Sequence, residues 1–318
     1  MLKALSCAWT FSVAIAVCGV DAVTAQSFPT KPIRLVTGAA GGGGDFLSRL
    51  IAPGFSNLLG QPVIVDTRPG NIGPEMVAKA VPDGYTLLLD STTFLIAPLL
   101  AKMPYEGLQD FSAISLLVTS LNILVVHPSV PANSVKDLIA LAKASPGKLN
   151  YGSGSASSSS LLATALFTAM TGVDIVRITY KGGGPTMTGL ISGEVQLVIA
   201  SAGSATPHIK SGKARALAVT SAQRSVLYPD LPTIAATVPG YESVSMTGVF
   251  APPRTPAALL NRLSQDAARA ANAPDIKEKS LATGLETVGS SPQQFAAAVK
   301  ADLARLGKVI KDAGIKGE

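Results

Sequence analysis

The sequence has few of the residues on which metal binding and acid–base catalysis depend. Its 318 residues include two His (His127 and His208) and two Cys (Cys7 and Cys18), and only 14% are charged, against about 25% in an average soluble domain. This inventory predicts no metal site and no cofactor, and gives His-dependent catalysis little support. The net charge of +6 comes from scattered Lys and Arg, so no nucleic-acid partner is expected.

The N-terminal segment 1–25 is typical of an export signal. Lys3 precedes an apolar run at 8–20, and small residues precede a cleavage position after Ala25. The run is too short to be assigned as a membrane-spanning helix. Lipid attachment at Cys18 is the alternative, but Val17 stands where a lipoprotein signal has a small residue. We therefore predict an exported, periplasmic protein, and cleavage after Ala25 leaves it without cysteine.

Beyond the leader, short β-branched runs alternate with segments of helical periodicity. The runs predict strands at 33–36, 62–65, 86–89, 175–180, 195–199 and 214–219. A Ser134-x-x-Asp137 capping box predicts the start of a helix, and Gly172 predicts the end of another. Such alternation predicts an α/β fold with mainly parallel sheets flanked by helices.

Two extended segments, 121–128 and 244–252, are predicted to cross between two lobes. The first lobe would contain 26–123 and the C-terminal part 247–318, and the second lobe 124–246. A chain that leaves one lobe, builds another and returns creates a cleft between them, where small molecules commonly bind.

A glycine-rich turn, 38–45, directly follows the first predicted strand and opens a helix. Its candidate site residues are Gly38, Ala39, Ala40, Gly41, Gly42 and Asp45. Small residues let backbone N–H groups approach a ligand, and a helix N-terminus favours an anion. The spacing matches neither the dinucleotide fingerprint nor a phosphate-binding P-loop. The turn therefore predicts a small carboxylate better than a nucleotide, and a plain strand–helix connection with Asp45 as N-cap is the structural alternative.

A serine-rich turn at 151–160 lies in the other predicted lobe. Its candidate site residues are Ser153, Ser155, Ser157, Ser158 and Ser159. Hydroxyl groups at a helix N-terminus suit a carboxylate or hydroxyl ligand. A flexible loop with one capping serine is the alternative. A serine nucleophile would need a base, and the segment lacks the G-x-S-x-G nucleophile elbow.

Two further strand–helix junctions carry hydroxyl groups. Gly183 and Thr186 follow the strand predicted at 175–180, and Ser91 and Thr92 follow the one at 86–89. Ligands bind beyond the carboxyl ends of strands in open α/β sheets, so four such junctions favour a binding protein.

The order of motifs along the chain resembles the receptors of tripartite tricarboxylate transporters, the Bug family. The matching motifs are Pro32-Ile33-Arg34-Leu35-Val36, Ala39-Ala40-Gly41-Gly42, Arg68-Pro69-Gly70, Pro82-Asp83-Gly84-Tyr85-Thr86, Pro104-Tyr105, Asp110-Phe111, Pro146-Gly147-Lys148-Leu149-Asn150-Tyr151, Tyr180-Lys181-Gly182, Gly212-Lys213, Arg215-Ala216-Leu217-Ala218-Val219-Thr220, Leu231-Pro232-Thr233, Pro239-Gly240-Tyr241-Glu242 and Ala251-Pro252. Each motif is short, but together they cover nearly the whole chain after the leader.

The resemblance implies a two-lobe periplasmic binding protein of type II. Such a receptor is a non-enzymatic monomer that closes on a small carboxylate and delivers it to membrane permease subunits. In the family the Ala-Ala-Gly-Gly turn holds the ligand carboxylate, and the serine-rich and Lys-Gly turns complete the site. Two readings remain open beside transport: a secreted hydrolase that uses the serine-rich turn, and a sensor that reports the ligand to a signalling receptor.

Some positions depart from the family pattern. Thr37 and Gly38 replace a proline and an aromatic residue, and Ala200 replaces an acidic residue that can meet a ligand ammonium group. Lost side-chain volume and lost negative charge predict a di- or tricarboxylate or an aromatic acid in preference to an amino acid.

Overall fold

The structure, a computed structural model, describes residues 28–40, 42–154, 158–312 and 314–315. The predicted leader, with the cleavage position after Ala25 and with Cys18, lies outside the described residues. No helix in the described ranges is long and apolar enough to cross a membrane.

The first part of the chain alternates strands and helices as the sequence predicts. The elements are β1 (Ile33–Thr37), α1 (Gly43–Leu59), β2 (Val63–Thr67), α2 (Ile72–Ala78), β3 (Thr86–Ser91) and α3 (Thr93–Leu100). β1 lies between β2 and β3 and pairs with both in parallel. A short 3-10 helix, Leu108–Asp110, leads into the next strand.

The middle of the chain repeats this alternation. Its elements are α4 (Val135–Ala144), β5 (Asn150–Ser153), α5 (Ser159–Thr171), β6 (Val176–Thr179), α6 (Gly183–Ile191), β7 (Leu197–Ser201), α7 (Ala202–Lys210) and β8 (Arg215–Val219). β5 pairs in parallel with β6 and β7. The Ser134 hydroxyl accepts a hydrogen bond from Asp137 N–H at the start of α4, and Gly172 ends α5 in the left-handed conformation, both as predicted.

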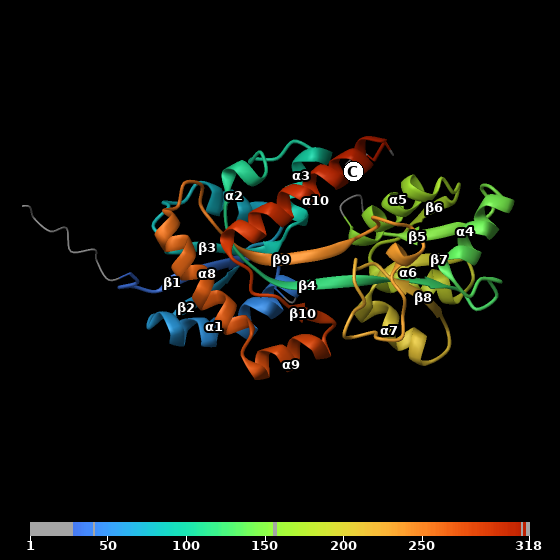
Figure 1. Ribbon diagram of the computed structural model, residues 1–318. Helices are drawn as coiled ribbons and strands as arrows, with labels where there is room; N and C mark the ends of the chain where they lie inside the picture. The colour runs from blue at the N-terminus through green and yellow to red at the C-terminus, as the bar shows by residue number, and fades with distance from the viewer. Residues whose placement is uncertain (1–27, 41, 155–157, 313, 316–318) are drawn as a thin grey trace, which may run out of the picture.

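Two long strands run through both halves of the molecule (Figure 1). They are β4 (Ser112–Val126) and β9 (Val244–Ala251), which pair antiparallel. The chain ends with α8 (Ala257–Ala271), α9 (Pro274–Ala282), β10 (Leu285–Thr287) and α10 (Pro292–Asp312), after a second 3-10 helix at Ile234–Ala236. The strands of the described chain form one ten-stranded sheet, ordered β2-β1-β3-β9-β4-β7-β5-β6, with β8 and β10 beside β4.

The directions of the strands decide where the two halves present their loops. β9 runs antiparallel to β4 and β3 runs antiparallel to β9, so β1 and β3 point the same way as β4. β7 runs antiparallel to β4, so β5, β6 and β7 point the opposite way. The carboxyl ends of the two parallel groups therefore face each other across the middle of β4.

The register gives the separation of these two ends. Ser91, the last residue of β3, pairs with Thr247, which pairs with Val118 of β4. Ser201, the last residue of β7, pairs with Asn122. At roughly 3.3 Å a residue, the four residues from 118 to 122 separate the two ends by about 13 Å along β4. Two connecting turns and a small solute can share that space.

Each half has its own hydrophobic core. The first half is filled by clusters around Leu35, Phe55 and Phe250, and the second by clusters around Leu166 and Val198. A smaller cluster joins the halves: Leu306 and Ile310 of α10 pack with Ile96 of α3 and Leu162 of α5. The α/β two-lobe class is therefore confirmed, with α10 lying along both lobes (Figure 1).

The sheet differs from the prediction in one respect. It is mixed, not mainly parallel, because β9, β7, β8 and β10 all pair antiparallel with β4. The predicted crossings at 121–128 and 244–252 overlap the end of β4 and the whole of β9. The early part of β4 pairs with β9 and β10 and its late part with β7 and β8, whereas β9 pairs with β3 and β4. The lobe boundaries at 123 and 246 stay a prediction.

Gly248 of β9 lies where the core leaves no room for a side chain. A Cβ at Gly248 would overlap the Phe295 ring and lie 2.5 Å from the Ser115 carbonyl oxygen, both in the core. We expect Gly248→Ala to lower the free energy of unfolding by about 2 kcal/mol. Gly307, inside α10, is the matched control, because a Cβ there would lie 3.6 Å from Leu99 Cδ1. Gly307→Ala should raise stability by about 0.5–1 kcal/mol, since alanine favours a helix. Urea denaturation measures both variants, and equal losses would contradict the packing argument.

Candidate functional site

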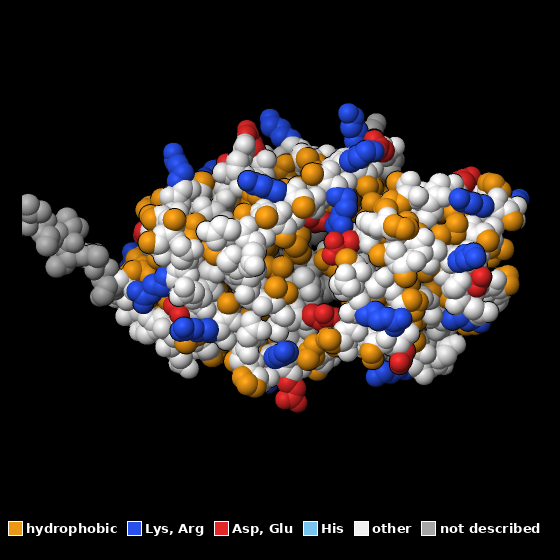
Figure 2. All heavy atoms as spheres, viewed as in Figure 1, with side chains coloured by type: hydrophobic (Ala, Val, Ile, Leu, Met, Phe, Trp, Pro, Cys, Tyr) orange, Lys and Arg blue, Asp and Glu red, His pale blue; other side chains and the backbone are white. Residues whose placement is uncertain are grey.

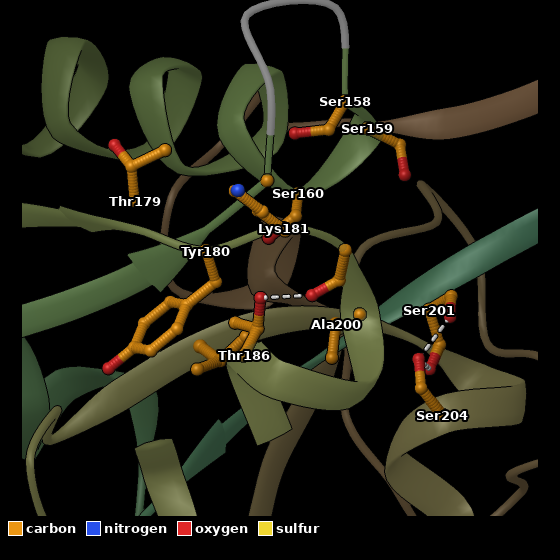
Figure 3. Close-up of a pocket in the computed structure, with 14 residues that line it drawn as sticks. Ser158, Ser159, Ser160, Thr179, Tyr180, Lys181, Thr186, Ala200, Ser201 and Ser204 are labelled. Carbon is orange, nitrogen blue, oxygen red and sulfur yellow. Dashed lines mark hydrogen bonds between the residues drawn. The ribbon is translucent and has the colours of Figure 1, made fainter. Parts of the chain in front are cut away.

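The carboxyl ends of β5, β6 and β7 border a cavity of about 650 Å³ in the second lobe. It is lined by Gly154, Ser158, Ser159, Ser160, Thr179, Tyr180, Lys181, Gly182, Gly183, Thr186, Val198, Ala200, Ser201 and Ser204. Figure 3 shows the serines of the α5 start on one side and Ser201 and Ser204 on the other. Five of the sequence-predicted site residues are among them: Ser158, Ser159, Gly183, Thr186 and Ala200.

Three helices begin at this cavity. Their N-caps are Ser158 for α5, Gly182 for α6 and Ser201 for α7. The first N–H groups of a helix have no partner within the helix, and the helix dipole makes this end positive. A Cβ on Gly183 would lie 3.5 Å from Ser204 Oγ, so the starts of α6 and α7 are close together. The cavity thus concentrates backbone donors, and the exposed Lys181 adds a positive charge.

The hydroxyl groups at this cavity differ in whether they already have a hydrogen-bond partner in the protein. Ser158 Oγ accepts the Leu161 N–H at 3.3 Å, and Thr186 Oγ1 donates to the Gly182 carbonyl at 2.8 Å. Ser201 and Ser204 hydrogen-bond each other. Ser160 Oγ is buried and finds no hydrogen-bond partner within the described part of the chain. A buried polar group of this kind is available to a ligand or water.

The first lobe has a second cavity, of about 390 Å³, at the carboxyl ends of β1 and β3. Its lining residues are Gly38, Ala39, Gly42, Gly43, Gly44, Leu47, Asp90, Ser91, Val118, Ser120, Ser245, Thr247 and Leu285. Here the sequence-predicted residues Gly38, Ala39, Gly42 and Ser91 come together. The turn is tight: Gly42 N–H donates to the Ala39 carbonyl at 3.1 Å, and a Cβ on Gly44 would lie 2.7 Å from Thr37 Oγ1.

The two cavities face each other, because the two groups of strand ends do. By the predicted lobe ranges, each is lined by residues of its own lobe, apart from Ser245 of β9 in the first-lobe cavity. In Figure 2 the surface is hollowed where the two halves meet. Helix starts present backbone N–H groups at both cavities: those of α5, α6 and α7 in the second lobe, called the second-lobe pole below, and that of α1 in the first lobe, called the first-lobe pole.

Other predicted site residues do not line either cavity. Ser153 is fully buried, and its hydroxyl accepts a hydrogen bond from Arg177 Nε at 2.8 Å. Because Arg177 Nη2 also donates to the Gly154 carbonyl at 2.8 Å, this pair anchors the start of the serine-rich turn. Thr92 is buried, and its N–H donates to the Met246 carbonyl at 2.8 Å. Their roles are structural in this geometry.

Asp45 and Ala40 also lie away from the cavity linings. Asp45 is the third residue of α1 and not its N-cap, which is Gly42. Its buried carboxylate accepts a hydrogen bond from Arg49 Nε at 2.7 Å. The positive end of the helix dipole also stabilises this negative charge. Ala40 is exposed beside the turn. Gly41, Ser155 and Ser157 lie outside the described residues.

Several lining residues were not among the predicted site residues: Ser160, Tyr180, Ser201 and Ser204 at the second-lobe cavity, and Asp90 at the first. Lys181, whose Lys-Gly turn the family resemblance places at the site, lines the second-lobe cavity. Asp90 and Ser201 stand at the carboxyl ends of strands, as the predicted residues do. Both lie within two residues of the end of a predicted strand, 86–89 or 195–199, so considering every polar residue at those ends would have found them.

Asp90 is the one charged residue among the lining residues of the first-lobe cavity. Burial raises the pKa of its carboxyl from 3.8 to about 6, and the hydrogen bond from Ser91 N–H partly opposes that shift. The bond joins Ser91 N to Asp90 Oδ1 at 2.7 Å. Nearby, burial and the charge of Asp90 raise the pKa of Tyr105 to about 12.

Because of this shift, we expect Asp90→Asn to raise the free energy of unfolding by an amount that depends on pH. The folded-state pKa lies above the ordinary value, so ionising Asp90 costs folding free energy. The cost is absent below about pH 3.8 and complete above about pH 6. Asparagine keeps the acceptor for Ser91 N–H without the charge. We expect the variant to exceed wild type in unfolding free energy by on the order of 1–3 kcal/mol at pH 8 and to match it near pH 4.

Asp137→Asn is the control for that measurement. Hydrogen bonds from the Ser134 side chain and the Asn133 N–H lower the pKa of Asp137. Its replacement should therefore destabilise the protein at neutral pH and lose its effect in acid, the opposite trend. Urea unfolding at a series of pH values distinguishes the two. A stability difference for Asp90→Asn that does not change with pH would contradict the assigned environment.

Comparison with known proteins agrees with this architecture. Residues 47–315 match the model of the tripartite tricarboxylate transporter family receptor. Protein BugT of Bordetella pertussis is 33% identical over 311 residues, which cover 95% of each chain.

Two solved structures resemble the chain along most of its length. R. palustris Rpa4515 with adipate is 37% identical, with a TM-score of 0.73, and the match covers 92% of this chain and 100% of that one. MatC from Rhodopseudomonas palustris with bound malate is 26% identical, with a TM-score of 0.69, over 89% of this chain and 100% of that one. The family model and the whole-length relatives lead to one conclusion: this chain belongs to the Bug family of tripartite tricarboxylate transporter receptors.

Proposed function

We propose that this receptor captures a small di- or tricarboxylate, or an aromatic acid, in the periplasm and delivers it to a tripartite tricarboxylate-type permease. The observation that carries the proposal is the convergence of three helix N-termini, those of α5, α6 and α7, on one cavity. Such termini bind anions through unpaired N–H groups. The glycine turn before α1 provides a comparable pole in the opposite lobe.

Two opposed donor poles suit a ligand with an anionic group at each end. Lys181 adds charge to the second-lobe pole, where the lining residues include no Asp or Glu. With Ala200 in that lining, a ligand ammonium group would find no carboxylate there. Two of the similar proteins are described with adipate and with malate, both dicarboxylates. We therefore propose that the group bound at the second-lobe pole is a carboxylate with no ammonium group beside it.

We propose that the chain binds its ligand without chemical change. Neither His127 nor His208 is among the lining residues of the two cavities, so the serines there have no imidazole base beside them. His127 Nδ1 instead lies 2.7 Å from Ser129 Oγ. A secreted serine hydrolase is the competing function, and turnover of generic esters that is lost in Ser158→Ala would favour it.

Lobe closure would carry the binding signal to the membrane. In this proposal 124–246 moves against 26–123 and 247–318, with β4 and β9 as the connection, and the permease recognises the closed monomer. Delivery to a sensor would use the same closure. Co-purification with permease subunits in the presence of ligand distinguishes the two.

A side chain within the glycine turn would obstruct access to its backbone donors. A side chain on Gly42 would lie 3.1 Å from the Ala39 carbonyl oxygen and occupy the cavity wall. The extended backbone of Gly42, with φ of −79°, accommodates any residue. Gly42→Val should therefore keep the fold but weaken adipate or malate binding by about tenfold or more in calorimetry. His127→Ala is the control and should bind as wild type does. A larger loss of affinity in His127→Ala than in Gly42→Val would contradict the proposed role of the glycine turn.

Lys181 places a positive charge at the second-lobe cavity. Lys181→Met should lower the affinity for adipate by about fivefold to tenfold and leave that for its neutral diamide, adipamide, unchanged, because only a carboxylate gains from the charge of the lysine. Lys210→Met, at the far end of α7, is the matched control and should change neither affinity. Equal losses for both ligands in Lys181→Met would show that the lysine charge does not act on a ligand carboxylate.

A further inference from the structure

The first-lobe cavity pairs a carboxylate-binding turn with an acidic side chain. β1 and β3 are parallel neighbours, with Thr37 opposite Leu89. The next residues, Gly38 just beyond the end of β1 and Asp90 still within β3, therefore lie side by side, about 5 Å apart at the usual strand spacing. Both line the cavity. An anion held by the turn would lie next to the Asp90 carboxylate.

Asp90 has few partners of its own. Its Oδ1 accepts the Ser91 N–H at 2.7 Å. The charge of Asp90 contributes to the raised pKa of Tyr105. The Tyr105 hydroxyl is not a partner of Asp90, however, because it donates its hydrogen bond to the Phe94 carbonyl at 3.1 Å. Across the described residues, no Lys, Arg or His forms an ion pair with Asp90, so no protein cation neutralises it. One carboxylate oxygen remains to meet a ligand.

A second carboxylate beside Asp90 is unfavourable unless the ligand also brings a hydrogen-bond donor. Like charges repel, and an ionised carboxylate can only accept hydrogen bonds. A hydroxyl or ammonium group within one or two bonds of the ligand carboxylate would fall between the turn and Asp90. That group would donate to the free carboxylate oxygen and offset the repulsion.

We propose that Asp90 is a specificity-determining residue, which selects carboxylates that carry a hydrogen-bond donor on the carbon next to the carboxylate held by the first lobe. This inference rests on the proposed function, because it assumes that the glycine turn holds a ligand carboxylate. We take the donor to be a hydroxyl, in line with the proposed carboxylate without an ammonium group. An ammonium group would also find an acceptor in Asp90, and aspartate in the ligand panel distinguishes the two. The ligand would then bind in one orientation, with its donor-bearing end in the first lobe and its other anionic end at Lys181.

The experiment is calorimetry at pH 7.5 with ligands that differ by one donor. The pairs are succinate and malate, tricarballylate and citrate, and phenylacetate and mandelate, with aspartate to compare ammonium with hydroxyl. In the pair that wild type binds, we expect the hydroxyl-bearing member to bind about tenfold or more tightly. Tighter binding of aspartate than of malate would keep Asp90 as the selecting residue and correct the proposed preference against amino acids.

Asp90→Asn is the decisive variant. Its Oδ1 can still accept the Ser91 N–H, but its NH₂ group would face the cavity and donate where the carboxylate accepted. The preference for the hydroxyl-bearing ligand should fall to about one or reverse, while the ligand without the hydroxyl binds as well or better. Asp230→Asn, an exposed acid of the second lobe outside both cavities, is the control and should keep the wild-type preference.

The outcomes separate this inference from the proposed function. If wild type binds both members of a pair equally, or Asp90→Asn keeps the preference, the role of Asp90 is overturned and carboxylate binding stands. If succinate binds tenfold more tightly at pH 5 than at pH 7.5 with no preference for malate, Asp90 acts as a proton donor and the inference is again overturned. If no carboxylate of the panel binds to wild type, the proposed function itself is contradicted.

Discussion

The antiparallel pairing of β4 with both β9 and β7 is the constraint on which the rest of the structure depends. It makes the parallel strands of the first lobe point toward the second and those of the second point toward the first. Because helices follow the carboxyl ends of these strands, α1 and α3 begin opposite α5, α6 and α7. The site is thus a product of strand direction, and the α10 contacts with both lobes support the same arrangement.

A site built from helix starts explains the low charge of the sequence. Backbone N–H groups of glycine and serine turns bind an anion without a large set of charged side chains, and their positions are set by secondary structure. The charged side chains that line the two cavities, Asp90 and Lys181, lie in opposite lobes. They can therefore act on selectivity and orientation, while the turns provide the common affinity for carboxylate.

Local sequence patterns were sufficient for the elements and for part of the site. The capping box at Ser134, the glycine stop at Gly172 and the turns at Gly38 and Ser158 depend on neighbouring residues, so the sequence displays them. The mixed sheet was not predictable in this way, because the strands that flank β4 are far apart in the chain. The same holds for Ser153, whose hydroxyl is turned to Arg177 by the pairing of β5 with β6. Asp90 became a candidate only when the strand register placed it beside Gly38.

The central claim is that one small carboxylate ligand bridges two opposed helix-start poles. A crystal structure of the wild-type protein with malate, which carries a hydroxyl beside one carboxylate, tests this most directly. One carboxylate should lie within hydrogen-bond distance of the N–H groups at the start of α1, and the other at the starts of α5, α6 and α7. Malate held at one pole alone, or in the separate cavity between α7 and the 281–284 segment, would contradict the claim.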